Sequence, residues 1–243
     1  MKRPIVLAVG VAVIVLVAAL GGAYVYFFSG LRTAPKSLAA STSSPAASAS
    51  SSAAPAGAAN LVGSWTVGAG SQAGYRVKEQ FAGQSSKHEA VARTPSVSGN
   101  LAIQQAAGGP QAKGIKFTAQ LANLQSVDQV AGFNVTQRDR IVSRALSVSQ
   151  YPDATFEAQS VNLPASIQSG GTETLTIPGQ LTIHGVTKPA QVTAQVKLNG
   201  SQVQANGSTA FNMTDFGISP PQVPITTVDP AVTLDFQLIL TKA

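Results

Sequence analysis

Apolar and polar residues alternate along many short runs of this chain, and this period of two restricts the fold more than any other feature. Residues 190–198 read AQVTAQVKL and residues 232–242 read VTLDFQLILTK, with an apolar residue at every second position over most of each run. Successive side chains of a β-strand point to opposite faces of the sheet, so each run predicts a strand with one buried face. One buried face per strand favours antiparallel pairing, because parallel sheets bury both faces.

The same alternation recurs across residues 61–243 and predicts a single all-β domain. Further runs lie at residues 96–104, 114–122 and 203–213, and segments rich in Gly, Pro and Asn separate the runs. The pattern predicts roughly eight strands, which fits either a closed barrel or a sandwich. A barrel of this size is filled by its own side chains or holds one elongated apolar ligand.

Residues 136–151 break the β pattern and predict one short helix that connects two strands. Thr136 and Asp139 have the spacing of a capping box, with Thr136 as the N-cap. Pro152 restricts the preceding residue to an extended backbone, so a strand is expected at residues 153–159. Four apolar residues form one face of the predicted helix, and three arginines lie mainly on the opposite side: Ile141, Val142, Ala145 and Leu146 against Arg138, Arg140 and Arg144.

The arginines of this helix and Asp139 have two interpretations. Arginine offers bidentate donors to a pyrophosphate or a similar head group, so the cluster could bind the polar end of a ligand. In the alternative, the arginines form a solvated helix face with one structural Asp–Arg pair. The sequence leaves both interpretations open.

No set of residues predicts catalysis or metal binding. The chain has no cysteine, which excludes disulfides, thiol nucleophiles and cysteine-ligated metals. His88 and His184 lie far apart without a carboxylate-rich neighbourhood, and His184 is expected in a hairpin turn. Neither a Gly-x-Ser-x-Gly nucleophile motif nor a Gly-rich phosphate loop is present. We therefore expect a protein that is not an enzyme.

Charge also argues against nucleic acid as a partner. The chain has a net charge of +6, but all ten acidic residues and twelve of the sixteen basic residues lie in residues 61–243. The domain therefore carries only +2, whereas nucleic-acid binding depends on a dense basic surface.

The first 60 residues predict a membrane anchor and a stalk. Residues 5–28 lack charge and, as a helix of about 36 Å, exceed the roughly 30 Å hydrocarbon core of a bilayer. Residues 1–4 are expected in the cytoplasm, and residues 29–60, rich in Ser, Ala and Pro, predict a disordered stalk. A cleaved signal peptide and a cytoplasmic linker are the alternatives. The expected location is the cell membrane, with a single span and residues 61–243 on the extracytoplasmic side.

Three blocks in order resemble the YceI-like family. They are GSWTV followed by GYRV (residues 63–77), RDRIVSRAL followed by YPDATFE (residues 138–157), and GQLTIHGVTKPAQV (residues 179–192). The resemblance covers nearly all of residues 61–243, and the anchor and stalk resemble actinobacterial envelope members. The chain departs from the family where a His-Ser pair is frequent, because Gly70 and Ser71 stand there.

The resemblance implies an eight-stranded antiparallel, lipocalin-like barrel with a short connecting helix, whose interior holds a polyisoprenoid chain. A membrane-tethered barrel that sequesters or transports an isoprenoid, such as a polyprenyl or quinone lipid, is the expected function. A solid barrel that serves as an envelope structural or interaction protein is the alternative. The oligomeric state is left open. The family motifs and the apolar strand faces together give these candidate ligand-binding residues: Phe117, Arg138, Asp139, Tyr151, Phe156, Leu181 and Phe236.

Overall fold

A computed structural model describes residues 37–38, 60–130 and 135–243 of the chain. The anchor predicted at residues 5–28, the N-terminus at residues 1–4 and most of the stalk lie outside the described residues. Among the residues that are described, no helix has both the length and the apolar character needed to cross a membrane.

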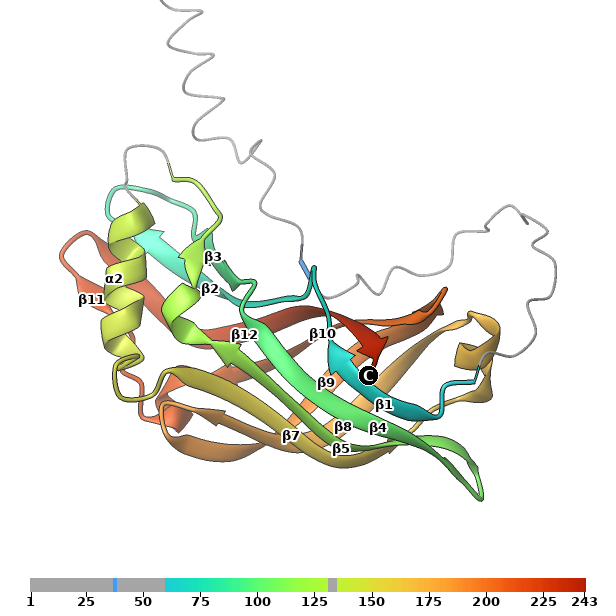
Figure 1. The fold of residues 1–243 in the computed structure, drawn as a ribbon. Helices are drawn as coiled ribbons and strands as arrows, with labels where there is room; N and C mark the ends of the chain where they lie inside the picture. The colour runs from blue at the N-terminus through green and yellow to red at the C-terminus, as the bar shows by residue number, and fades with distance from the viewer. Residues whose placement is uncertain (1–36, 39–59, 131–134) are drawn as a thin grey trace, which may run out of the picture.

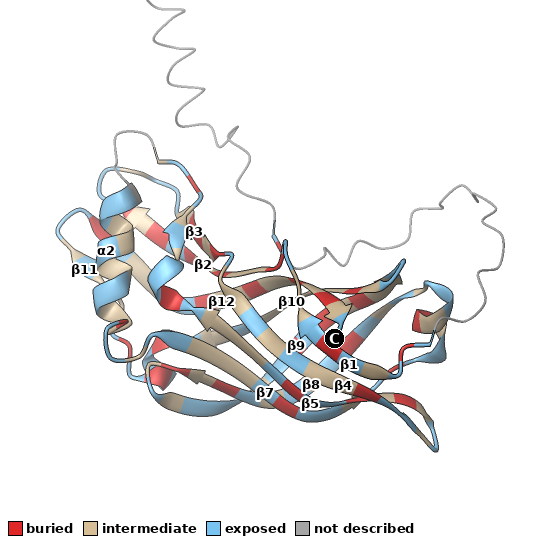
Figure 2. Ribbon diagram, viewed as in Figure 1, coloured by how far each residue is buried: buried red, intermediate tan, exposed pale blue. Residues whose placement is uncertain are grey.

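The described strands pair into one antiparallel sheet, which confirms the all-β prediction. Buried and exposed residues alternate along many of these strands, as the period of two predicts (Figure 2). The twelve strands of the described residues are β1 (Gly63–Val67), β2 (Gln72–Phe81), β3 (His88–Thr94), β4 (Val97–Ala106), β5 (Gly109–Gln120), β6 (Gln125–Ser126), β7 (Asp153–Asn162), β8 (Thr172–Ile183), β9 (Val186–Asn199), β10 (Gln202–Asn212), β11 (Gln222–Val223) and β12 (Thr226–Lys242).

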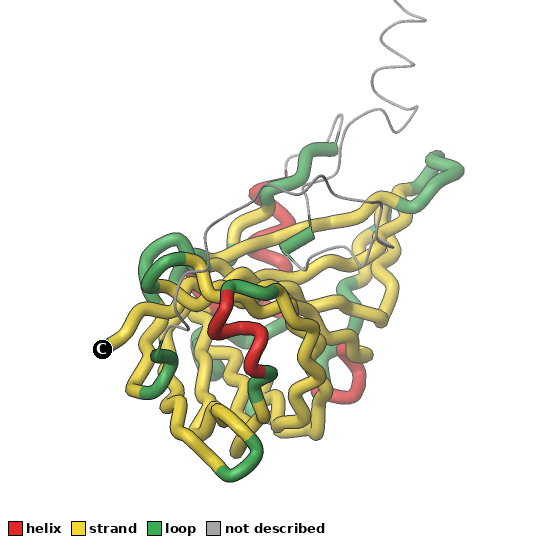
Figure 3. Tube along the Cα trace, turned by 90° about the vertical axis from the view of Figure 1, so that its right-hand side faces the viewer, coloured by secondary structure: helices red, strands yellow, loops and turns green. Residues whose placement is uncertain are grey.

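The sheet closes on itself because the long strand β12 pairs along its free edge with both β2 and β1. Its first part pairs with β2, and its last residues pair with β1 in the register Trp65↔Lys242. β1 and β2 together take one strand position beside β12. β4, which pairs with β1, and β3, which pairs with β2, together take the next position. The result is a closed eight-strand antiparallel barrel rather than a sandwich, and its strands curve around a common axis in Figure 3.

One α-helix, α2 (Val135–Ala145), and three short 3₁₀ helices connect the described strands. The 3₁₀ helices are η1 (Leu121–Asn123), η2 (Ala165–Ser169) and η3 (Met213–Phe216). In Figure 1, α2 lies beside β11 at one end of the barrel, and η2 lies at the other end. The barrel therefore has an α2 end and an η2 end.

The predicted helix exists, but the prediction that a capping box begins it is wrong. The helix begins at Val135, so Thr136 lies within its first turn rather than at the N-cap. Asp139 instead accepts hydrogen bonds from the backbone nitrogen and the hydroxyl of Ser126, at 3.0 and 2.7 Å. The acidic side chain thus fixes the helix to β6, a tertiary contact that local spacing does not reveal.

The apolar face of α2 points into the barrel, as predicted, and Arg140 and Arg144 are exposed on the opposite side. The prediction that Arg138 lies on this outer face with them is wrong. Arg138 precedes Ile141 by three residues and Val142 by four, which puts its side chain on the inward face. Buried acidic partners, described below, account for this inward position.

Two clusters of buried apolar residues fill the two ends of the barrel. The η2-end cluster includes Leu61, Trp65 and Ile167, each at most 2% exposed. The α2-end cluster includes Ile183, Met213 and Phe216, and Ala145, the last residue of α2, and Leu146, which follows it, pack against this cluster.

The hairpin between β8 and β9 turns at His184 and Gly185, which confirms the predicted turn. Their φ angles are 53° and 72°, the pair of positive values that a two-residue type I′ turn requires. The His184 ring nitrogens lie 3.2 Å from the carbonyl oxygen of Phe216 and 3.3 Å from the hydroxyl of Ser147. His184 therefore holds three segments of the α2 end together.

Candidate functional site

The barrel encloses a cavity of about 560 Å³. This volume falls within the range of roughly 300–1,000 Å³ typical of small-molecule sites. Mostly aliphatic and aromatic side chains from β2, β4, β5, β7, β8, β9, β10 and β12 line it, and α2 and the β11–β12 hairpin contribute at the α2 end. Ile225 of that hairpin lines the cavity and is also 51% exposed, so the cavity wall at this end is in contact with solvent.

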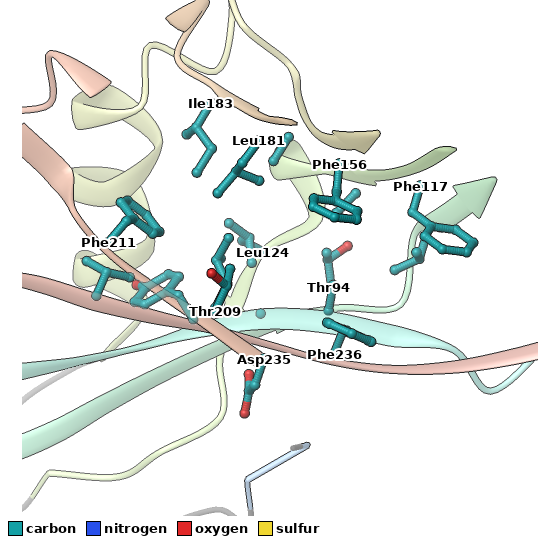
Figure 4. A pocket seen from close by; sticks show the side chains of 18 of the residues that line it. Thr94, Phe117, Leu124, Phe156, Leu181, Ile183, Thr209, Phe211, Asp235 and Phe236 are labelled. Atoms are coloured by element: carbon teal, nitrogen blue, oxygen red, sulfur yellow. The ribbon is translucent and has the colours of Figure 1, made fainter. Parts of the chain in front are cut away.

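Five of the seven candidate ligand-binding residues line this cavity. Phe117 and Phe156 are direct neighbours across β5 and β7, and Phe156 is also paired with Leu181 of β8. Phe236 lies across the cavity from Phe156 (Figure 4). Arg138 is the fifth. Contact of these residues with a ligand stays a prediction.

Asp139 and Tyr151 do not line the cavity. The Asp139 carboxylate accepts a hydrogen bond from Ser126. The Tyr151 ring packs edge-on against the His184 ring, with centroids 5.0 Å apart. A β-carbon added at Gly185 would lie 2.5 Å from the Tyr151 ring, so the turn and the tyrosine fit closely together. These two family motif residues contribute to the structure of the α2 end.

Asp235 belongs to the wall of the barrel, but its side chain points away from the cavity (Figure 4). Its carboxylate accepts hydrogen bonds from Arg76 and from the backbone nitrogen of Leu38, both at 3.0 Å. Leu38, at 8% exposed, is buried. The described part of the predicted stalk therefore contacts the outer wall.

A charged cluster lies at the α2 end of the cavity, and sequence reasoning missed most of it. We use "charged cluster" for Glu79, His88, Asp128 and Arg138. Glu79 lies on the inward face of β2, where the alternating residues are Tyr75, Val77 and Phe81. His88 is its direct neighbour on β3, and Asp128 follows β6.

Arg138 connects the acidic members of this cluster. Its guanidinium donates to Oε1 of Glu79 at 2.5 Å, to Oδ1 of Asp128 at 2.7 Å and to the hydroxyl of Ser126 at 3.2 Å. The Asp128 carboxylate also accepts from Nε2 of His88 at 2.7 Å and from the backbone nitrogen of Val91 at 3.0 Å. The side chains of Glu79 and Asp128 are only 5% and 2% exposed, so these ion pairs are shielded from water.

The two carboxylates respond differently to the same guanidinium. Burial raises the pKa of Glu79 and outweighs the opposing effect of Arg138. Burial also acts to raise the pKa of Asp128, but hydrogen bonds from His88 and Arg138 outweigh it and the pKa is lowered. The difference follows from the number of donors among the described residues, because Asp128 accepts from His88, Arg138 and Val91 whereas Glu79 accepts from Arg138.

Glu79, His88 and Asp128 also have the residue types of a metal site, with ligand atoms within 4.8 Å of one another. Arg138, however, already binds both carboxylates and supplies the positive charge that a cation would bring. The expectation that His88 lacks a carboxylate neighbourhood is wrong. Asp128 is 40 residues away in the sequence, and folding brings it to His88.

One sequence signal could have revealed part of this cluster. Glu79 is an acidic residue in phase with the apolar residues of its strand, and an inward charge requires a buried partner. Arg138, three and four residues before the apolar face of the helix, is the corresponding basic residue. Asp128 lies in an irregular segment and carries no such signal.

The fold and the cavity together define a class: a closed antiparallel barrel with an apolar interior, as in lipocalin-like binding proteins. The chain belongs to the YceI-like family, because the model of the YceI-like domain matches residues 65–240. The resemblance predicted from the three sequence blocks is thus confirmed.

Similar proteins occur in Pseudomonas. A UPF0312 protein of Pseudomonas putida is 34% identical over 130 residues, which cover 49% of this chain and 60% of that protein. A UPF0312 protein of Pseudomonas syringae pv. tomato is 32% identical over 110 residues, which cover 42% and 54%. The chain therefore spans only about 60% or less of the length of these relatives.

The barrel also resembles a solved structure, a polyisoprenoid binding domain from Saccharophagus degradans implicated in plant cell wall breakdown. The TM-score is 0.54 at 14% identity, and the match covers 74% of this chain and 98% of that one. This likeness supports the barrel fold.

Proposed function

We propose that this chain binds an isoprenoid or a similar apolar lipid inside its barrel, for sequestration or transport. The observation that carries the proposal is the cavity of about 560 Å³, with its aliphatic and aromatic lining. Each buried CH₂ group contributes about 0.8 kcal/mol, so a chain-like apolar ligand gains affinity along its whole length. The polyisoprenoid binding domain of similar fold supports the same ligand class.

The proposal includes a location. Residues 5–28 would anchor the chain in the cell membrane, and residues 29–60 would hold the barrel on the extracytoplasmic side. The uncharged apolar length of the first segment and the Ser, Ala and Pro content of the second support this arrangement. An anchored barrel would stay close to the bilayer from which an apolar lipid must come.

A solid barrel that acts only as a structural or interaction protein is disfavoured by the cavity. Catalysis forms no part of the proposal, because the charged groups at the cavity form ion pairs with one another.

Lipid analysis of the purified full-length chain tests the proposal. We expect native mass spectrometry to show one bound lipid per barrel after exchange into a fresh detergent, and solvent extraction to release an apolar lipid. A barrel that remains lipid-free in several purifications, including those from lipid-supplemented cells, would contradict the proposal.

A further inference from the structure

The charged cluster also bears on which head group the cavity accepts, and this inference rests on the lipid-binding function proposed above. We propose that the barrel selects lipids with an uncharged head group that can accept a hydrogen bond, and discriminates against phosphorylated and carboxylated lipids. The Tyr75 hydroxyl is the proposed donor to that head group.

The described residues that line the cavity offer an anion no positive charge that is not already paired. Arg138 is the one basic residue among the described residues that line the cavity. Both of its terminal nitrogens already donate to carboxylates, those of Glu79 and Asp128. A phosphate at this site would therefore meet a guanidinium whose positive charge two buried carboxylates already balance.

The charged cluster also carries no excess positive charge. Glu79 and Asp128 contribute two negative charges against the one positive charge of Arg138, which leaves the cluster at −1 when His88 is neutral and at zero when it is protonated. Burial already raises the pKa of Glu79, which shows the penalty on negative charge at this position. A head-group anion beside Glu79 would meet the same penalty and a like charge.

The other basic groups of the helix do not change this balance. Arg140 and Arg144 are exposed on the outer face of α2 and do not line the cavity. Their charges are separated from the interior by the helix itself and are screened by water and salt.

Tyr75 offers a hydroxyl group to an uncharged head group. Its side chain lies on the inward face of β2 with Glu79, lines the cavity and packs against the α2-end cluster. Tyr75 is half-buried, and the described residues provide no hydrogen-bond partner for its hydroxyl, so this group is available to a ligand in the cavity. Burial raises the pKa of Tyr75, so the hydroxyl stays protonated and can donate to a carbonyl or an alcohol oxygen.

A competition between three lipids with the same chain tests this selectivity. The detergent-solubilised full-length chain is mixed with equal concentrations of geranylgeraniol, geranylgeranyl phosphate and geranylgeranoic acid, and native mass spectrometry gives the amount of each complex. We expect the alcohol complex to exceed each anionic complex by about tenfold or more. Equal or preferred binding of the phosphate or the acid would overturn the proposal.

Two substitutions separate the two parts of the argument. Tyr75→Phe keeps the ring and removes the donor, and we expect it to weaken alcohol binding about 3–10-fold. Glu79→Gln removes one negative charge at nearly the same volume, and we expect it to reduce the preference over the anions at least about fivefold. Unchanged affinities in folded Tyr75→Phe protein would overturn the role of Tyr75.

The result also distinguishes this proposal from the proposed function. If none of the three lipids binds, lipid binding itself is contradicted. If all three bind equally, the cavity holds lipid but the head-group selectivity is wrong. Substitution of Ala205 on the cavity wall by Phe is the control for lipid that associates outside the cavity, because this larger side chain points inward.

Discussion

The two ends of the barrel are closed in different ways. At the η2 end, Leu61, Trp65 and Ile167 form an apolar plug, and the Trp65 indole nitrogen satisfies its hydrogen bond on the carbonyl oxygen of Leu61 at 2.8 Å. At the α2 end, two buried carboxylates share one guanidinium, and Ile225 is half-exposed. The η2 end has the composition of an ordinary core. The α2 end has polar groups at a cavity wall that contacts solvent, which is where selection of a ligand would take place.

Removal of the apolar plug should give the largest loss of stability. Trp65→Ala deletes a side chain that is 2% exposed, and we expect a loss of about 3–5 kcal/mol in the free energy of unfolding. Because the loss arises from apolar packing, it should be similar at pH 4 and pH 7. Chemical denaturation at both pH values measures it. A loss that depends strongly on pH would contradict the apolar account of this end.

Disruption of the charged cluster should give an effect of similar size but of different origin. Arg138→Met keeps most of the side-chain volume and leaves Glu79 and Asp128 without their shared cation. We expect a loss of about 3–5 kcal/mol at pH 7, because the remaining buried charges are uncompensated. Denaturation at neutral pH gives this number, and a loss below about 1 kcal/mol would show that the ion pairs are not buried as described.

The two carboxylates should separate in their response to pH. The folded pKa of Asp128 lies below its ordinary value of 3.8, so its contribution is fully present above that pH and is lost as the pH falls through the folded pKa. Asp128→Asn should therefore cost about 1.5–3 kcal/mol at pH 7, and less as the pH falls below 3.8.

Glu79 should show the opposite trend. Its folded pKa lies above the ordinary value of 4.5, so ionisation costs stability as the pH rises through this range. Glu79→Gln avoids that cost, and its stability relative to the unsubstituted chain should increase between pH 4 and pH 7. Parallel denaturation series for Glu79→Gln and Asp128→Asn give both trends. Identical trends in the two variants would contradict the different environments of the two carboxylates.

The exposed face of α2 should give the smallest effect. Arg140→Met alters a side chain on the outside of the same helix, and we expect a change within about 0.5 kcal/mol. It is the matched control for Arg138→Met, since both replace an arginine of α2 by the same residue. A comparable loss in both variants would mean that the helix, and not the buried ion pairs, is what the substitution disrupts.

The difference between the two ends also explains what the sequence could predict. Alternation in residues such as Val232, Leu234 and Phe236 reports local geometry, so the strands and the apolar interior were predictable. The charged cluster depends on contacts between β2, β3, α2 and the segment after β6, and Asp128 in particular has no local pattern that marks it. The sequence pattern groups Arg138 with the other two arginines, which lie on the exposed helix face, because the buried acidic partners of Arg138, Glu79 and Asp128, are 59 and 10 residues away in the sequence.

Lipid occupancy in two matched variants tests the central claim, that the barrel interior is a ligand cavity. Ala205 lines the cavity, whereas Ala210 on the same strand is exposed on the outside. Native mass spectrometry of the full-length chain should show one bound lipid in Ala210→Phe, as in the unsubstituted chain, and loss of most of that lipid in Ala205→Phe, because the added ring takes up part of the cavity. Equal lipid occupancy in the two folded variants would contradict the claim.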